Sequence, residues 1–275
     1  MRWIIGLTVR EALRRRLVVT AFGLGAAFLA LYGLALGWIH REIVRHGTPD
    51  PRMGVELVGF FALAALYVVH LMSVMAAAVG TVNTLSGEIA SGVILAVAAR
   101  PLARWQILLG KGIGHALWLL LYTLGLGGGV LGLTTAITGW APAGWARGLA
   151  LLALGALVPL ALSLWGGAGL STLANGALVL GLYGVAFVGG WAEQIGGLAG
   201  APAVVDLGIL ASLLMPAEAM WRRAAYELQS PMARLSGLTP FTASSIPNDR
   251  MILYAIAYIA ILLLAAVRRF ERRDL

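Results

Sequence analysis

The sequence predicts an all-α integral membrane domain with six transmembrane helices. Of the 275 residues, 60% are hydrophobic and only 12% are charged, whereas soluble domains carry about 25% charged residues. The mean hydropathy is +0.88. The hydrophobic residues gather in stretches of about 20 or more, the length that an α-helix needs to cross a bilayer. We therefore expect residues 1–275 to form a single transmembrane domain.

Six hydrophobic stretches define the expected spans, and more polar segments separate them. The spans cover residues 17–39, 55–82, 107–138, 147–173, 176–197 and 251–267. His40–Gly54 is expected to be a polar connection, and Ala174–Asn175 a tight turn between the fourth and fifth spans. Pro159 lies near the middle of the fourth span, where it predicts a kink.

Residues 1–16 predict an amphipathic elbow helix that lies at the membrane surface. Trp3, Ile4 and Leu7 can share one face of this helix. Its basic residues lie toward another face, where they would meet anionic lipid headgroups: Arg10, Arg14, Arg15 and Arg16. The following hydrophobic run has 23 residues (17–39), longer than the roughly 7–15 of a signal-peptide core. We therefore expect a retained first span.

Residues 201–250 are expected to form an outer segment before the last span. Val204–Leu214 is hydrophobic enough to enter the membrane, but the run is too short to cross it. Two arrangements of residues 201–221 stay open, a re-entrant segment or one lying on the outer surface. An amphipathic helix is expected around Pro216–Gln229.

The distribution of charge predicts the orientation. With six spans, both termini lie on one side, and that side carries twelve basic and four acidic residues, a net charge of +8. The other side carries eight of each, so its net charge is zero. The positive-inside rule assigns the basic side to the cytoplasm. We therefore expect a multi-pass protein of the cytoplasmic (inner) membrane with both termini cytoplasmic, and nucleic acid is not needed to explain the charge.

Residues 84–111 are the longest polar-flanked segment between two hydrophobic spans. Ile89, Val93 and Val97 recur at helical spacing, and Pro101 limits the helix, which predicts an amphipathic helix over residues 87–99. The residues alone leave two interpretations open. The helix is either an ordinary interfacial loop helix or one that docks a soluble partner and transmits force into the membrane domain.

The chain resembles the ABC-2-type permeases in one stretch of sequence. This stretch has the motif G-E-x-x-S-G, then an apolar run, then R-P-L-x-R and I-L-L-G-K. It is similar in particular to the subgroup that contains the permease of the nitrous-oxide-reductase maturation transporter. The matching residues are Gly87, Glu88, Ser91, Gly92, Pro101, Arg104, Gly110 and Lys111. The REALRRR run of residues 10–16 resembles the elbow helix of that family, and the RRFERRDL ending is also similar.

The resemblance implies an export permease subunit that pairs with a second copy, as a homodimer, and with two ATP-binding-cassette ATPase subunits. Residues 87–99 would form the coupling helix that docks in a groove of the ATPase. Glu88 would interact favourably with the dipole of this helix, and Gly92 would allow close backbone approach. Pro101 would fix the place where the docking helix gives way to the next span.

No ATP chemistry is expected in this chain. The motif GxxxxGK[ST] is absent, since Lys111 is followed by Gly112. ATP and magnesium would be bound by the partner subunit, and we expect no cofactor and no metal in this chain. The runner-up function is a non-transporting membrane scaffold or maturation factor. An intramembrane enzyme is the least favoured, because no nucleophile motif accompanies His70 or His115.

Glu193 and His70 are the candidate residues of a transport pathway or gate. Ionisable groups in membrane spans are costly to bury and are often functional. Each has a structural alternative. Glu193 would cap the outer interface by pairing with Gln194, Arg222 or Arg223, and His70, like His115, would be a hydrogen-bonded packing residue.

Overall fold

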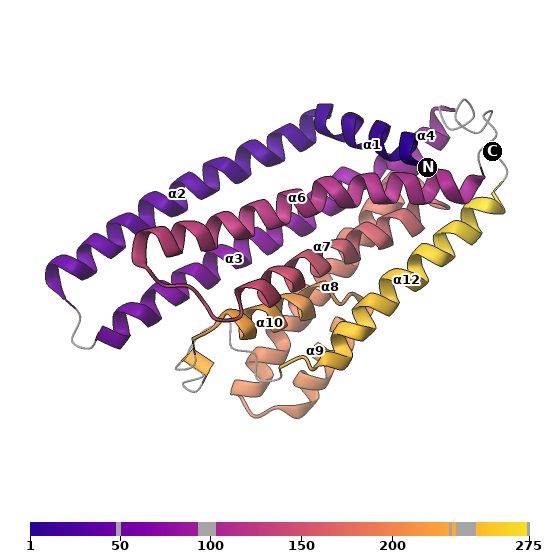
Figure 1. Cartoon of the computed structure of the whole chain (residues 1–275). Coiled ribbons are helices and arrows are strands. Elements are labelled where there is room, and N and C mark those ends of the chain that lie inside the picture. The colour runs from indigo at the N-terminus through magenta and orange to yellow at the C-terminus, as the bar shows by residue number, and fades with distance from the viewer. Residues whose placement is uncertain (48–50, 93–102, 231–232, 235–245, 274–275) are drawn as a thin grey trace.

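The computed structural model describes residues 1–47, 51–92, 103–230, 233–234 and 246–273. These residues form helices and turns without a β-strand, which confirms the predicted all-α class (Figure 1). The helices are α1 (Arg2–Arg14), α2 (Arg16–His46), α3 (Pro51–Thr81), α4 (Asn83–Ala90), α6 (Arg104–Thr138), α7 (Trp145–Gly167), α8 (Thr172–Leu198), α9 (Pro202–Leu214), α10 (Ala217–Leu228) and α12 (Asp249–Glu271).

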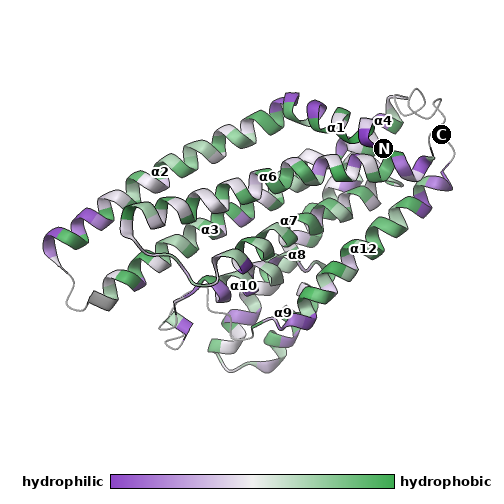
Figure 2. Ribbon diagram, in the orientation of Figure 1, coloured by the Kyte–Doolittle hydropathy of each residue, from purple (hydrophilic) through white to green (hydrophobic). Residues whose placement is uncertain are grey.

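Six helical segments are long and hydrophobic enough to cross a membrane: α2, α3 together with α4, α6, α7, α8 and α12. Hydrophobic residues cover most of their length, and hydrophilic residues gather toward the two ends of the bundle (Figure 2). Both termini lie at one end, with α1, α4, the beginning of α6 and the end of α12 (Figure 1). We call this the basic end and the opposite one the distal end.

Helix α7 is the centre of the bundle. In the hydrophobic segment of α7, 72% of the residues are buried, whereas the corresponding shares are 17% in α2 and 11% in α12. Helices α3, α6, α10 and α12 all pack on α7. The exposed hydrophobic side chains of α2 and α12 therefore face outward, where the lipid of a membrane would cover them.

The first expected connection is partly helical. Helix α2 continues to His46, through residues 40–46 that were expected to be a polar connection. The imidazole Nε2 of His46 lies 3.0 Å from a carboxylate oxygen of Glu42, one turn earlier. Such a pair supports an exposed helical turn, and polar residues can extend a helix beyond the hydrocarbon layer.

The turn between α7 and α8 lies at residues 168–171, so the expected turn at Ala174–Asn175 is wrong. Ser171 caps α8, because its hydroxyl accepts a hydrogen bond from the backbone N–H of Ala174 at 3.3 Å. Asn175 is buried, and its amide donates to the carbonyls of Val82 (3.2 Å) and Ser163 (2.9 Å). These bonds account for a polar residue inside the first turn of α8.

Helix α9 enters the bundle from the distal end. Gly196, near the distal end of α8, lies against Val204, whereas Gly189, farther into the bundle, lies against Ala211. Helix α9 therefore runs antiparallel to α8 as it leaves the distal end.

Helix α10 returns to the distal end along α7. Its axis makes an angle of 109° with that of α9. Met220 packs against Gly155, and Leu228 packs against Gly148, which is closer to the distal start of α7. Most side chains of α10 are buried. Residues 202–228 thus form a re-entrant hairpin, one of the two arrangements that the sequence left open for residues 201–221.

Two tyrosines of α12 donate hydrogen bonds to backbone carbonyls at the bend of this hairpin. The hydroxyl of Tyr254 donates to the carbonyl of Leu213 at 2.6 Å, and that of Tyr258 to the carbonyl of Leu214 at 2.9 Å. The last carbonyls of a helix lack an N–H partner within the helix. Tyr258 comes nine residues after Asp249, about 13 Å along α12. At that depth no water would satisfy the carbonyls, so the hydroxyls replace it.

We predict that replacing both tyrosines, Tyr254→Phe with Tyr258→Phe, destabilises the protein. Each freed carbonyl should cost roughly 1–2 kcal/mol, because an acceptor that would face hydrocarbon loses its donor while the packing of the ring is kept. Thermal unfolding in detergent measures the effect. Tyr122→Phe is the matched control, since the Tyr122 hydroxyl has no hydrogen-bond partner among the described residues. Equal losses from the two variants would contradict this role of the hydroxyls.

Candidate functional site

At the basic end, the structure brings together two residues of the predicted coupling stretch. Helix α4 follows α3 directly and carries Glu88, and the first turns of α6 carry Lys111. The ammonium Nζ of Lys111 donates to Oε1 of Glu88 at 2.5 Å. The side chains are only 8% and 14% exposed. Each buried charge is therefore stabilised by the opposite charge of its partner instead of by water. The pair holds α4 against α6.

His115 makes a second connection between α4 and α6. Its Nε2 lies 2.9 Å from the hydroxyl of Thr84, and its Nδ1 lies 3.0 Å from the indole nitrogen of Trp118. An indole N–H can only donate, so Nδ1 is the acceptor and Nε2 carries the proton that is donated to Thr84. His115 thus has the arrangement of a neutral packing residue.

The structure corrects the predicted coupling helix over residues 87–99. Helix α4 begins at Asn83, four residues earlier, because Thr84, Leu85 and Ser86 are buried against the bundle. It ends at Ala90, and Gly92 has a φ of +72°. This left-handed conformation ends helices and suits glycine. A continuous helix through residues 91–92 is therefore wrong, and residues 93–99 and Pro101 lie outside the described residues.

Gly92 has a local role in addition to the expected one. Its position permits the turn after α4, and a Cβ atom placed there would meet no atom within 4 Å. The space around Gly92 is therefore open within the described residues, and close approach of a partner's backbone stays a prediction. Gly87 is the more crowded glycine, since a Cβ there would lie 1.9 Å from the side-chain oxygen of Asn83.

The other predicted coupling residues have separate local roles. The hydroxyl of Ser91, at the exposed turn, donates to the carbonyl of Glu88 at 3.3 Å. Arg104 contacts the end of α12, where its Nη1 donates to the carbonyls of Glu271 (3.0 Å) and Arg273 (2.6 Å). Arg104 therefore joins the beginning of α6 to the end of α12.

The elbow helix lies across the beginning of α6. Ile4 packs on Gly110, and Thr8 packs on Gly114. Helix α1 ends at Arg14, Arg15 is extended, and α2 begins at Arg16, which divides the predicted elbow from the first span. Three of the predicted elbow arginines are exposed: Arg10, Arg14 and Arg16.

The fourth elbow arginine, Arg15, pairs with Glu11. Its Nη2 donates to the Glu11 carboxylate at 2.6 Å. Burial raises the pKa of Glu11, but the hydrogen bond and charge of Arg15, together with the charge of Lys111, lower it by more. The pKa of this carboxyl is therefore held below its ordinary value of 4.5. Glu11 stays ionised at neutral pH, in keeping with the charge balance of this end.

In the distal half, Glu193 is an internal ion-pair partner. It lies on α8, is 1% exposed, and pairs with the Nη1 of Arg222 on α10. The Nη2 of Arg222 donates to the hydroxyl of Ser212 on α9 at 2.6 Å. The alternative that paired Glu193 with Arg222 therefore describes the structure. The pair lies inside the protein, where it closes the re-entrant hairpin onto α8.

His70 meets a carboxylate that the sequence did not bring to attention. It lies on α3 with 1% exposure, and its Nε2 is 3.4 Å from Oε2 of Glu218 on α10. The ring of Trp221 is stacked beside it, with 5.8 Å between centroids. Residues 216–229 were expected outside the membrane, so Glu218 was not counted among the buried acids. One pattern in the sequence could have indicated that Glu218 is buried. Glu218 and Arg222 lie four positions apart in an alanine-rich helix, and small residues permit close packing of helices.

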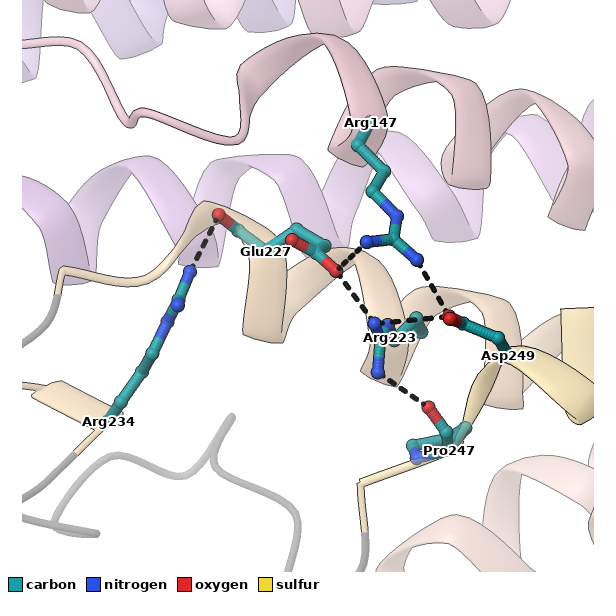
Figure 3. A network of polar contacts seen from close by, with 6 residues as sticks. All are labelled: Arg147, Arg223, Glu227, Arg234, Pro247 and Asp249. Carbon is teal, nitrogen blue, oxygen red and sulfur yellow. Dashed lines mark hydrogen bonds and ion pairs between the residues drawn. The ribbon is translucent and has the colours of Figure 1, made fainter.

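A surface network joins the distal ends of α7, α10 and α12 (Figure 3). Arg147 lies 3.2 Å from a carboxylate oxygen of Glu227 and 2.7 Å from one of Asp249. Arg223 contacts the same two carboxylates at 3.0 and 3.2 Å, and also donates to the carbonyl of Pro247 at 3.1 Å. This network therefore attaches α10 to α7 and to the beginning of α12.

Comparison with known proteins identifies the family. A family model described as "ABC-2 family transporter protein" matches residues 8–275. The chain belongs to this ABC-2 transporter family. No curated protein matches the sequence significantly. Similarity to the subgroup of the nitrous-oxide-reductase maturation permease stays a prediction.

Membership in the ABC-2 family places this chain among membrane components of transport, which are not themselves catalysts and normally work with an ATP-binding subunit. The six hydrophobic helical segments agree with a multi-pass membrane protein. Among the described residues, no three His, Asp or Glu side chains converge so that they could hold a metal ion.

We predict that Glu88→Gln lowers the free energy of unfolding by roughly 3 kcal/mol, because the buried ammonium of Lys111 loses its countercharge. The double variant Glu88→Gln/Lys111→Met should recover most of this loss. Thermal unfolding in detergent measures both variants. Glu42→Gln serves as the control, since its exposed pair with His46 contributes little. A double variant that is no more stable than Glu88→Gln alone would show that the pair is not the reason.

Proposed function

We propose that this chain is the permease subunit of an ATP-driven exporter in the cytoplasmic (inner) membrane. It works as a homodimer with two ATP-binding-cassette ATPase subunits. The family match, the six hydrophobic segments and the concentration of positive charge at one end support the proposal. The partner subunits bind ATP and magnesium, and this chain binds neither. Both termini then lie in the cytoplasm, as the positive-inside rule expects.

The observation that carries the proposal is the buried pair of Glu88 and Lys111. It joins α4 to α6, while α4 is also continuous with α3. The hydroxyls of Ser86 and Thr172 are hydrogen bonded at 2.9 Å and link α4 to the first turn of α8. A displacement of α4 is thus transmitted to three spans at once. This is the property that a coupling segment needs.

The proposed mechanism is alternating access. Closure of the two ATPase subunits on ATP moves the α4 segment of each permease copy. The attached spans follow, and the cleft between the two copies changes shape. The turn at Ser91–Gly92 is the contact point for the ATPase, since Ser91 is exposed at the end of α4.

The orientation can be tested by cysteine labelling, because the chain contains no cysteine. With a membrane-impermeant maleimide, we expect Arg45→Cys at the distal end to be labelled in intact cells. Ser91→Cys should be labelled only after the cells are opened. The reverse pattern would contradict a cytoplasmic basic end.

The same variants test coupling. The permease is co-expressed with an ATPase subunit encoded nearby, and the complex is purified. A bifunctional cross-linker should join Ser91→Cys to the ATPase, whereas Arg45→Cys should give no such product. A bulky maleimide at Ser91→Cys should abolish the effect of the permease on ATPase activity, and the same label at Arg45→Cys should not. A permease that purifies alone, or an ATPase rate unchanged by the label at Ser91→Cys, would refute the proposal.

A further inference from the structure

The basic end has a groove that the coupling site does not use. Its volume is about 770 Å³, and it lies between the last turns of α12 and the turn from α7 to α8. One part of the lining is strongly basic and the other is hydrophobic. The residues that matter here are Arg268, Arg269, Arg272, Arg273, Ile261 and Leu264.

The positive charge of the groove is not neutralised from within the described part of the chain. None of the four arginines forms an ion pair with a carboxylate among those residues. Two are nevertheless held in place. The guanidinium of Arg269 lies 5.3 Å from the ring centroid of Trp165, and Arg273 donates to the carbonyl of Ala168 at 2.9 Å. Within the described residues, the groove thus presents oriented cations without an acidic partner.

The hydrophobic part of the groove lies along a membrane span. Ile261 and Leu264 belong to α12 and are 64% and 61% exposed. Arg272 comes eleven positions after Ile261, which corresponds to about 16 Å along the helix. The hydrocarbon core of a bilayer is about 30 Å thick. The groove therefore extends from the level of the headgroups well into the hydrocarbon layer.

We propose that this groove binds an anionic phospholipid. Its phosphate lies among the arginines, and one acyl chain lies along α12 beside Leu264 and Ile261. Guanidinium groups donate paired hydrogen bonds to phosphate oxygens, and basic pockets at the cytoplasmic side of membrane helices suit anionic headgroups. A soluble protein could neutralise the arginines, but it would not reach Ile261 in the hydrocarbon. The depth of the groove therefore favours a lipid.

The bound lipid would act on a junction between helices. Arg273 contacts the turn after α7, and its own carbonyl accepts a hydrogen bond from Arg104 at the beginning of α6. A phosphate beside Arg272 and Arg273 would reduce the mutual repulsion of the arginines at this junction. The lipid would stabilise the attachment of α12 to α6 and α7, independently of any ATPase.

Native mass spectrometry of the detergent-purified full chain tests the proposal. Phosphatidylglycerol and phosphatidylcholine with the same acyl chains are added separately, and inorganic phosphate is added as a third arm. We expect phosphatidylglycerol to bind and to be retained in preference to phosphatidylcholine. The variant Arg268→Gln/Arg272→Gln should weaken phosphatidylglycerol binding by about thirtyfold. Both side chains are exposed and have no partner among the described residues, so the fold should be kept.

Two further variants complete the test. Arg45→Gln/Arg250→Gln removes the same charge from exposed distal positions and should leave lipid binding unchanged. Ala265→Trp fills the hydrophobic part of the groove and should also displace the lipid, although the arginines remain. Equal binding of the two lipids would overturn the proposal. So would displacement of the lipid by inorganic phosphate, an undiminished affinity of Arg268→Gln/Arg272→Gln, or an unchanged affinity of Ala265→Trp.

Discussion

The structure depends on one constraint, which is that polar groups at membrane depth need partners inside the protein. A hairpin that bends within a bilayer exposes the last carbonyls of its first helix, and hydrocarbon offers them no donor. Here the hydroxyls of Tyr254 and Tyr258 supply the hydrogen bonds. The charged side chains of the hairpin follow the same constraint. Arg222 and Glu218 are buried, and they meet Glu193 and His70 from neighbouring helices.

The two ends of the bundle satisfy their charges in different ways. At the distal end, Arg147 and Arg223 pair with the carboxylates of Glu227 and Asp249, and these contacts join three helices (Figure 3). At the basic end, Glu88 and Lys111 form one buried pair, whereas the arginines at the end of α12 are left without acidic partners in the described residues. These distal charges are therefore paired within the bundle. The basic end has charge available for other molecules.

Much of the architecture could be predicted from the sequence because hydrophobicity is a local property. A run of about 20 hydrophobic residues has few alternatives to spanning a membrane, so all six spans were recognised. The motif residues Glu88 and Lys111 were assigned to one site, and the structure pairs them across 23 positions. Local patterns were less informative where tertiary contacts dominate. The polar Asn175 indicated a turn, yet its bonds to Val82 and Ser163 bury it inside α8. Likewise, periodicity predicted a helix through residues 91–92, where Gly92 makes a turn.

By itself, the sequence determined the class of the protein, the number of long hydrophobic helices and the end at which the positive charge gathers. These properties follow from composition and from spacing along the chain. Only the tertiary structure decided that residues 202–228 re-enter the bundle, and which buried charges meet. The physical reason is that a charged residue in a short helix is compatible with an exposed surface or with a buried pair. The choice between them rests on whether a distant helix brings a partner such as Glu193 into contact.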